Sequence, residues 1–279
     1  MSRYCRITSL LSLGFVVLCL TSAVGDDRPT KNAQPTVNDL SMEVAALQAL
    51  YQFRFTPEQM VKLKKLAGET AEETGARLAV AVSDAFRRTL FDLRSALVKA
   101  DDEERIAKLF ERLEDLRDAE NPELDDAVEL TDAARRRAPE VLGWLNARQV
   151  ATHLAGYGDE FPDPLERILA ALNKVRGLKD EQWKQLRDEV SEEVARLVAG
   201  LDTEKAGHVS DRVVQLLIQV RALKDDEFKK ERPELEKTAR QIVGEVGPLD
   251  VLRHAVERSL ADLLSNPRLA AAIDARLKK

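Results

Sequence analysis

The sequence predicts an all-α fold built from antiparallel helical hairpins, and three observations support this prediction. Charged residues make up 33% of the chain and aromatic residues 5%, a balance that suits packed amphipathic helices better than a sheet. Apolar residues recur three and four positions apart, as at Leu40, Val44 and Leu47, and polar and apolar residues do not alternate over long stretches. Proline, glycine and capping residues separate the helical segments. We therefore expect about ten or more helices from Val37 onward.

The first 25 residues have the pattern of a secretory signal peptide. Arg3 and Arg6 precede an apolar run over residues 7–20, and the small residues Ala23 and Gly25 suit a signal peptidase. We expect cleavage after Gly25 and an exported protein, either periplasmic or extracellular.

A membrane anchor and a lipoprotein are the two alternatives to a cleaved signal peptide. The apolar run 7–20 is shorter than the roughly 20 residues that a membrane-spanning helix needs, which argues against a membrane anchor. A lipoprotein attached at Cys19 would need a small residue before the cysteine, and Leu18 is large. We expect no transmembrane segment after signal cleavage.

Cleavage would leave a mature chain without thiols, because Cys5 and Cys19 both lie in the signal segment. A chain of about 250 residues can bury enough apolar surface to be stable without disulfides. Loss of Arg3 and Arg6 takes the formal net charge from −6 to −8, which argues against nucleic acid as a partner.

Residues 26–36 are polar, contain two prolines and are expected to form a disordered linker. Residues 37–279 are expected to form one all-helical domain, or two subdomains that meet near 156–163, where the chain is rich in glycine and proline. The expected helical segments are 41–52, a helix starting at 57, a helix carrying Leu78, Val80, Val82, Phe86 and Leu97, and then 102–119, 131–138, 140–145, 147–156, 164–177, 180–199, 210–223, 225–243 with a break at Pro233, 249–264 and 267–279.

One helix start contains every element of an N-terminal stop signal. Thr56 is the predicted N-cap, Pro57 the first helical residue and Gln59 the residue that closes a capping box. Phe55 and Met60 are placed to pack on each other as a hydrophobic staple.

Other helix starts repeat parts of this pattern. Leu145, Asn146 and Gln149 occupy the positions of Phe55, Thr56 and Gln59, 90 residues further on. Asp163 and Glu166 form a second predicted capping box. A common origin explains the match between the segments at 55 and 145, and so does capping chemistry that selects the same residue types.

A clearer internal repeat covers residues 175–184 and 220–229, where six of ten positions are identical at a spacing of 45 residues. The first copy contains Leu178, Gln182 and Trp183. A period in the forties is typical of two-helix repeats, so a duplicated helical hairpin and a short solenoid-like array are both consistent with it.

Known catalytic and cofactor motifs are missing from the sequence. His153, His208 and His254 lie more than forty residues apart, so they do not form a metal-binding motif. Glycine-rich phosphate loops and GxSxG motifs are also missing. Carboxylates are abundant, but the acidic runs at 101–104 and 125–126 are placed to stabilise helix N-termini. We expect no cofactor and no metal.

The segments FTPEQ at 55–59 and LNARQ at 145–149, with LKDEQ at 178–182 as a weaker third, resemble the LTxxQ motif of the Spy-like periplasmic chaperones. This chain has Phe55, Asn146 and Lys179 where that motif has Leu, Thr and Thr. Lys179 cannot cap a helix as Thr does, so we expect Asp180 to cap the helix that starts there. This chain is also much longer than the members of that family. The resemblance implies an exported, all-helical protein that works without cofactors and binds unfolded client proteins.

These observations predict an exported, non-catalytic helical scaffold that binds another protein, with a chaperone-like role included. The alternative is an envelope hydrolase whose site consists of carboxylates, and the abundant Asp and Glu residues support it. An apolar groove lined by several helices would favour binding, whereas two carboxylates facing each other in a polar cleft would favour hydrolysis.

Overall fold

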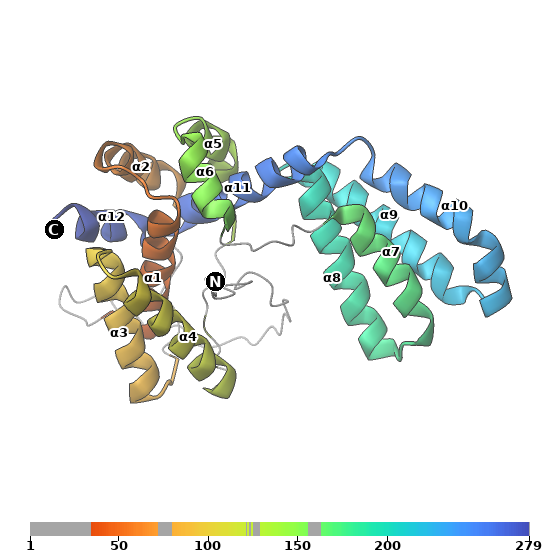
Figure 1. The fold of residues 1–279 in the computed structure, drawn as a ribbon, viewed down its shortest axis with the longest axis horizontal. Coiled ribbons are helices and arrows are strands. Elements are labelled where there is room, and N and C mark those ends of the chain that lie inside the picture. The colour runs from red at the N-terminus through yellow and green to blue at the C-terminus, as the bar shows by residue number, and fades with distance from the viewer. Residues whose placement is uncertain are drawn as a thin grey trace, which may run out of the picture. The chain divides into compact units, whose positions relative to one another are not determined.

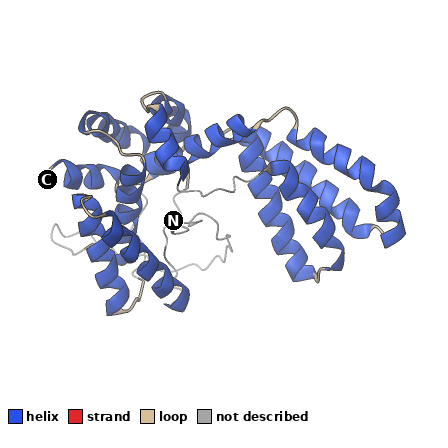
Figure 2. Ribbon diagram, viewed as in Figure 1, coloured by secondary structure: helices blue, strands red, loops and turns tan. Residues whose placement is uncertain are grey.

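The computed structural model describes residues 35–71, 80–120, 122, 124, 129–155 and 163–278. Over these residues it contains α-helices and one short 3-10 helix, without strands, and the all-α prediction is confirmed (Figures 1 and 2). The predicted signal peptide, nearly all of the predicted linker, and Tyr157 and Phe161 in the Gly- and Pro-rich segment lie outside the described residues.

The described chain divides into two compact units. Unit 1 contains the residues up to 155 together with those from Leu260 onward, and unit 2 contains residues 163–259. The chain passes from unit 2 back into unit 1 within one helix, α11 (Pro248–Ser265). This return was not predicted from the sequence.

Unit 1 is organised around α1 (Val37–Gln52), whose apolar face packs against α3 and α12. Leu47 of α1 and Phe86 and Leu93 of α3 are fully buried. Helix α12 also contacts α2, and α2 contacts α5. The other helices of this unit are α2 (Pro57–Thr70), α3 (Asp84–Lys99), α4 (Glu103–Glu120), α5 (Asp132–Leu142), α6 (Ala147–Ala155) and α12 (Leu269–Leu277).

Buried hydrogen bonds fix the C-terminal segment in unit 1. The Asn266 side chain donates to the carbonyl oxygen of Met42 at 3.0 Å, and the Thr70 hydroxyl donates to the carbonyl oxygen of Leu264 at 2.7 Å. Because these groups are buried, breaking either bond would leave a polar group without water or partner.

Unit 2 contains a four-helix bundle in which α7, α8, α9 and α10 contact each other in chain order and α10 closes the ring against α7. Helices α7 and α9 also contact each other. Its core contains Ile168, Val194, Leu217 and Ala239, one from each helix. The elements are α7 (Pro164–Lys174), the 3-10 helix η1 (Val175–Gly177), α8 (Asp180–Ala199), α9 (Thr203–Ala222) and α10 (Asp225–Val243).

Two predicted helix starts were wrong by several residues because a capping residue was overlooked. Helix α1 begins at Val37 rather than 41, since Thr36 accepts a bond from the Asp39 amide and Asp39 accepts one from the Thr36 amide. Thr36, at the end of the predicted linker, is therefore an N-cap. Helix α9 begins at Thr203 rather than 210, since Asp202 accepts a bond from the Lys205 amide at 2.9 Å.

The predicted start of the third helix was also too early. Helix α3 begins at Asp84, where Ser83 accepts a bond from the Phe86 amide at 3.0 Å. Val80 and Val82 therefore precede the helix, and Leu78 lies outside the described residues. Gly68 lies within α2 and does not interrupt it.

The predicted breaks at Pro139 and Pro233 were wrong, because α5 and α10 each continue through their proline. Both prolines are exposed, so the carbonyl group that loses its helical partner four residues earlier can bond to water. Buried residues on the opposite face, such as Ala138 and Leu235, keep each helix against its core.

Candidate functional site

The two predicted helix starts of unit 1 each form a capping box. Gln59 accepts a bond from the Thr56 amide at 2.9 Å, and its own amide donates to the Thr56 hydroxyl at 3.2 Å. Asn146 and Gln149 make the same pair of bonds at 3.1 and 3.0 Å. These side chains satisfy amide groups that a helix start leaves without partners.

The two helix starts also bond to each other. The Gln59 side-chain amide donates to the carbonyl oxygen of Trp144 at 2.7 Å, and that of Gln149 donates to the carbonyl oxygen of Arg54 at 3.1 Å. The two glutamine side chains lie within hydrogen-bond distance of each other as well. Arg54 and Trp144 hold equivalent positions in the two segments, so the contacts are reciprocal.

Apolar side chains surround the pair of glutamines. Phe55 and Met60 are buried, and Leu145 is half-buried. His153 is buried and stacks on Phe53 with ring centroids 3.9 Å apart. Burial lowers the pKa of His153 to about 4, so this imidazole is neutral at pH 7. The residues of the LTxxQ-like motif therefore serve the packing of unit 1.

The two copies of the ten-residue repeat in unit 2 make reciprocal contacts too. Arg221 pairs with Asp180 at 2.5 Å and lies over the Trp183 ring, with its guanidinium carbon 5.0 Å from the centroid. Arg176 pairs with Asp225 and lies over the Phe228 ring at 4.0 Å. We call these two contacts the arginine clasps.

The clasps relate the two copies by an approximate local two-fold axis, because each copy presents its arginine to the same positions of the other. Leu178 and Leu223 take equivalent places, since each follows a helix end and packs half-buried against the bundle core. In a solenoid all repeats stack in the same direction, whereas these two copies face each other. The solenoid-like array therefore stays a prediction.

Two details of the predicted capping in unit 2 were wrong. Asp180 does not cap α8: Lys179 is the N-cap, Gln182 accepts a bond from its amide at 3.4 Å, and Asp180 pairs with Arg221 instead. An ammonium group cannot accept a bond from an amide, so this helix start has half of a capping box.

The second correction concerns α7. The Asp163 side chain accepts bonds from the Leu165 and Glu166 amides at 2.8 and 3.3 Å. Among the described residues, the Glu166 carboxylate does not accept the bond from the Asp163 amide that would complete a capping box. Repulsion between the two carboxylates disfavours the return bond.

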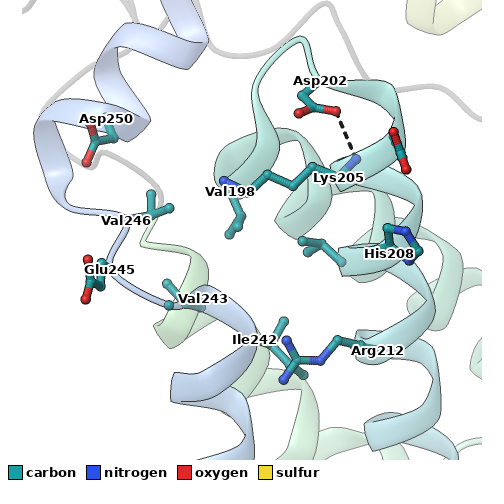
Figure 3. Close-up of a pocket in the computed structure, with 13 residues that line it drawn as sticks. Val198, Asp202, Lys205, His208, Arg212, Ile242, Val243, Glu245, Val246 and Asp250 are labelled. Carbon is teal, nitrogen blue, oxygen red and sulfur yellow. Dashed lines mark hydrogen bonds between the residues drawn. The ribbon is translucent and has the colours of Figure 1, made fainter.

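A hollow in unit 2 lies between α9 and the segment that joins α10 to α11, and it encloses about 620 Å³ (Figure 3). Its floor consists of apolar side chains, most of which also belong to the bundle core. They are Val198, Val209, Ile242, Val243 and Val246.

Charged side chains form the rim of this hollow. Figure 3 shows Lys205, His208 and Arg212 on the α9 side and Glu245 and Asp250 on the opposite side. Glu204 and Asp202 complete the rim at the start of α9. Four carboxylates face two permanent cations here, so the rim is acidic on balance.

The carboxylates of the rim do not form an acid–base pair of the kind that a hydrolase needs. Asp202 and Asp250 cap helices by accepting bonds from the Lys205 and Gly247 amides. Glu204 and Glu245 are exposed. A hydrolase needs two carboxylates that converge on one bond, whereas these four cap helices or extend into water.

A second hollow of about 480 Å³ adjoins the first along the seam between α9 and α10. Both hollows are lined by Arg212 and Ile242, so together they form one groove, which we call the α9–α10 groove. Leu216 forms part of the floor of the second hollow, and Ile218 at its edge is 45% exposed.

The groove combines residues that the sequence analysis did not single out, apart from His208. His208 was expected in a helix connection, but it lies exposed within α9. Ile218 is exposed and lies outside the core-facing pattern of α9, and it was the one sign of the groove that the sequence contained.

His254 is half-buried in unit 2, and its Nδ1 lies 2.8 Å from the carbonyl oxygen of Leu197.

Gly200 allows this approach of His254. Its φ of +61° favours glycine, and a Cβ atom there would lie 2.6 Å from the imidazole ring.

Within the described ranges, His, Cys, Asp and Glu side chains do not form a group of three or more that could hold a metal ion. Likewise, the helices that the structure describes include none long and apolar enough to cross a membrane.

Over the described residues the protein is all-α, and its unit 2 pairs two helical hairpins and carries a groove along the α9–α10 seam. Comparison with protein-family models, curated proteins and solved structures gave no match to this chain.

Proposed function

We propose that the mature protein is an exported, non-catalytic helical scaffold that binds another polypeptide through the α9–α10 groove, in a chaperone-like or a dedicated binding role. The observation that carries this proposal is the groove itself: two adjoining hollows with apolar floors and a charged rim on one helix seam. Grooves of this kind accept apolar side chains of a partner while their rims stay hydrated.

The resemblance of the segments at 55, 145 and 178 to the LTxxQ motif supports the same proposal. The carboxylate-based hydrolase has less support, because the rim carboxylates of the groove cap helices or are exposed. Export rests on the order of basic, apolar and small residues over 1–25.

Purified mature protein tests the binding role. We expect it to slow the aggregation of a chemically denatured test protein, or to retain defined envelope proteins in a pull-down from which a denatured sample of this chain retains none. Failure in both assays would contradict the proposal.

Export is tested separately by N-terminal sequencing of the protein recovered from the cell envelope or the medium. We expect a sequence that starts near Asp26. An intact Met1 in the membrane fraction would contradict signal cleavage without bearing on the groove.

A further inference from the structure

We infer that the occupant of the α9–α10 groove is an amphipathic helix of a partner protein, with two large apolar side chains seven residues apart and a carboxylate between them. This inference rests on the proposed binding function. It adds the conformation, the spacing and the charge of the segment that binds.

The conformation follows from the walls of the groove. Helices α9 and α10 satisfy their own backbone groups, and in the segment between α10 and α11 the Gly244 and Gly247 amides donate to the Arg240 carbonyl oxygen and the Asp250 carboxylate. The groove therefore offers no row of free amides and carbonyls to an extended strand. An extended occupant would leave its own backbone without partners on that side, whereas a helix satisfies its backbone internally.

The spacing follows from the two hollows. Val209 lies in the floor of the first and Leu216 in the floor of the second, seven residues apart on α9, which corresponds to about 10 Å along the helix axis. Apolar side chains at positions i and i+7 of a helix that lies along α9 have the same spacing and face one side. Each side chain would then enter one hollow.

The charge follows from Arg212, which lines both hollows and therefore lies between the two apolar positions. Its guanidinium donates to the carbonyl oxygen of Gln241 at 3.3 Å, which leaves further N–H groups for a partner. A carboxylate between the two apolar side chains of the occupant can bind them. The acidic rim of the first hollow favours basic residues elsewhere on the occupant.

Labelled 16-residue helical peptides test the inference by fluorescence anisotropy with the full mature protein. The first peptide carries leucines seven residues apart, one glutamate between them and lysines near its ends. The second has the same composition with the leucines five residues apart, and the third has lysine in place of the central glutamate. We expect the first peptide to bind at least about tenfold more tightly than either of the others.

Matched variants locate the site. Ile218→Asp should weaken binding of the first peptide about tenfold, whereas Val61→Asp, at an exposed position of α2 in unit 1, should leave it unchanged. Arg212→Glu should reverse the preference between the glutamate and lysine peptides, because the charge between the hollows is inverted. Circular dichroism checks that each variant is folded.

Equal affinity for the three peptides, or equal effects of Ile218→Asp and Val61→Asp, would overturn the inference. If that happens while the wild-type protein still slows aggregation or retains its partners, the proposed function stands and only this occupant is wrong. If neither assay detects binding, both proposals fail.

Discussion

Single side chains in unit 1 hold helix starts together, and Gln149 is the clearest case. It is 6% exposed, and it bonds to its own helix start, to the carbonyl oxygen of Arg54 and to Gln59. Removing such a side chain takes a partner from several part-buried polar groups at once, which costs more than the loss of one exposed bond. Thr56, by contrast, is exposed and caps one helix.

This difference predicts unequal losses of stability. Thr56→Ala should lower the free energy of unfolding by about 1 kcal/mol, the usual cost of a lost N-cap. Gln149→Ala should lower it by about 2 kcal/mol or more, because the carbonyl oxygen of Arg54 and the Gln59 amide lose a partner. Urea unfolding curves measure both values. Equal losses would mean that the contact between the two helix starts adds nothing.

His153 predicts a pH dependence of stability. Burial lowers its pKa from the ordinary value of 6.5 to about 4, so between these values the unfolded chain binds more protons than the folded one. The contribution of His153 is complete above pH 6.5 and is lost as the pH falls toward 4. From pH 7 to pH 5 it should fall by about 2 kcal/mol.

His153→Phe is the control, since phenylalanine can stack on Phe53 but does not titrate. The difference in unfolding free energy between pH 7 and pH 5 should be about 2 kcal/mol smaller in this variant than in the wild type. The same pH dependence in both proteins would show that His153 is not protonated on unfolding.

At the scale of helices, the arginine clasps connect the hairpin of α7 and α8 with the hairpin of α9 and α10. The carboxylates of the clasps are exposed, and exposed ion pairs contribute little. The arginines are less exposed and lie on the faces of Trp183 and Phe228, where stacking adds to the charge interaction.

The clasps therefore predict that the arginine matters more than its carboxylate partner. Arg221→Ala should lower the stability of unit 2 by about 1 kcal/mol through the lost stacking on Trp183. Asp180→Asn should have a smaller effect that disappears at high salt. Thermal unfolding in low and high salt compares the two variants. A larger loss for Asp180→Asn would reverse this assignment.

For the whole molecule, the two units have separate cores. The apolar cluster of unit 2 draws only on residues between Leu165 and Val246. Unit 1 depends on the C-terminal segment, since Leu269, Ala272 and Ile273 of α12 are fully buried. A core of this size supports independent folding of a domain of about 100 residues.

A fragment of residues 163–259 should therefore be helical and unfold cooperatively by itself. A chain that ends at residue 259 should lose the cooperative unfolding of unit 1, because α12 is missing from its core. Circular dichroism of both proteins during urea titration checks this. An unfolded 163–259 fragment would show that unit 2 needs the rest of the chain.

The sequence alone determined what depends on near neighbours. Helical periodicity and capping residues gave the all-α class and most of the helix starts, because the groups involved lie within four positions of each other. The 45-residue repeat predicted equivalent places for Leu178 and Leu223. The breaks predicted at Pro139 and Pro233 were wrong, because packing on both sides of each proline keeps the helix continuous.

Only the tertiary structure decided what depends on distant residues. Three features join positions far apart in the chain. They are the hydrogen bonds of Gln59 and Gln149 to the other helix start, the contacts of Arg176 and Arg221 with the other repeat copy, and the return of α12 to unit 1. The α9–α10 groove is likewise lined from several helices. Its residues share no spacing motif, because a groove is formed by the distances between packed helices and not by the order of residues along one of them.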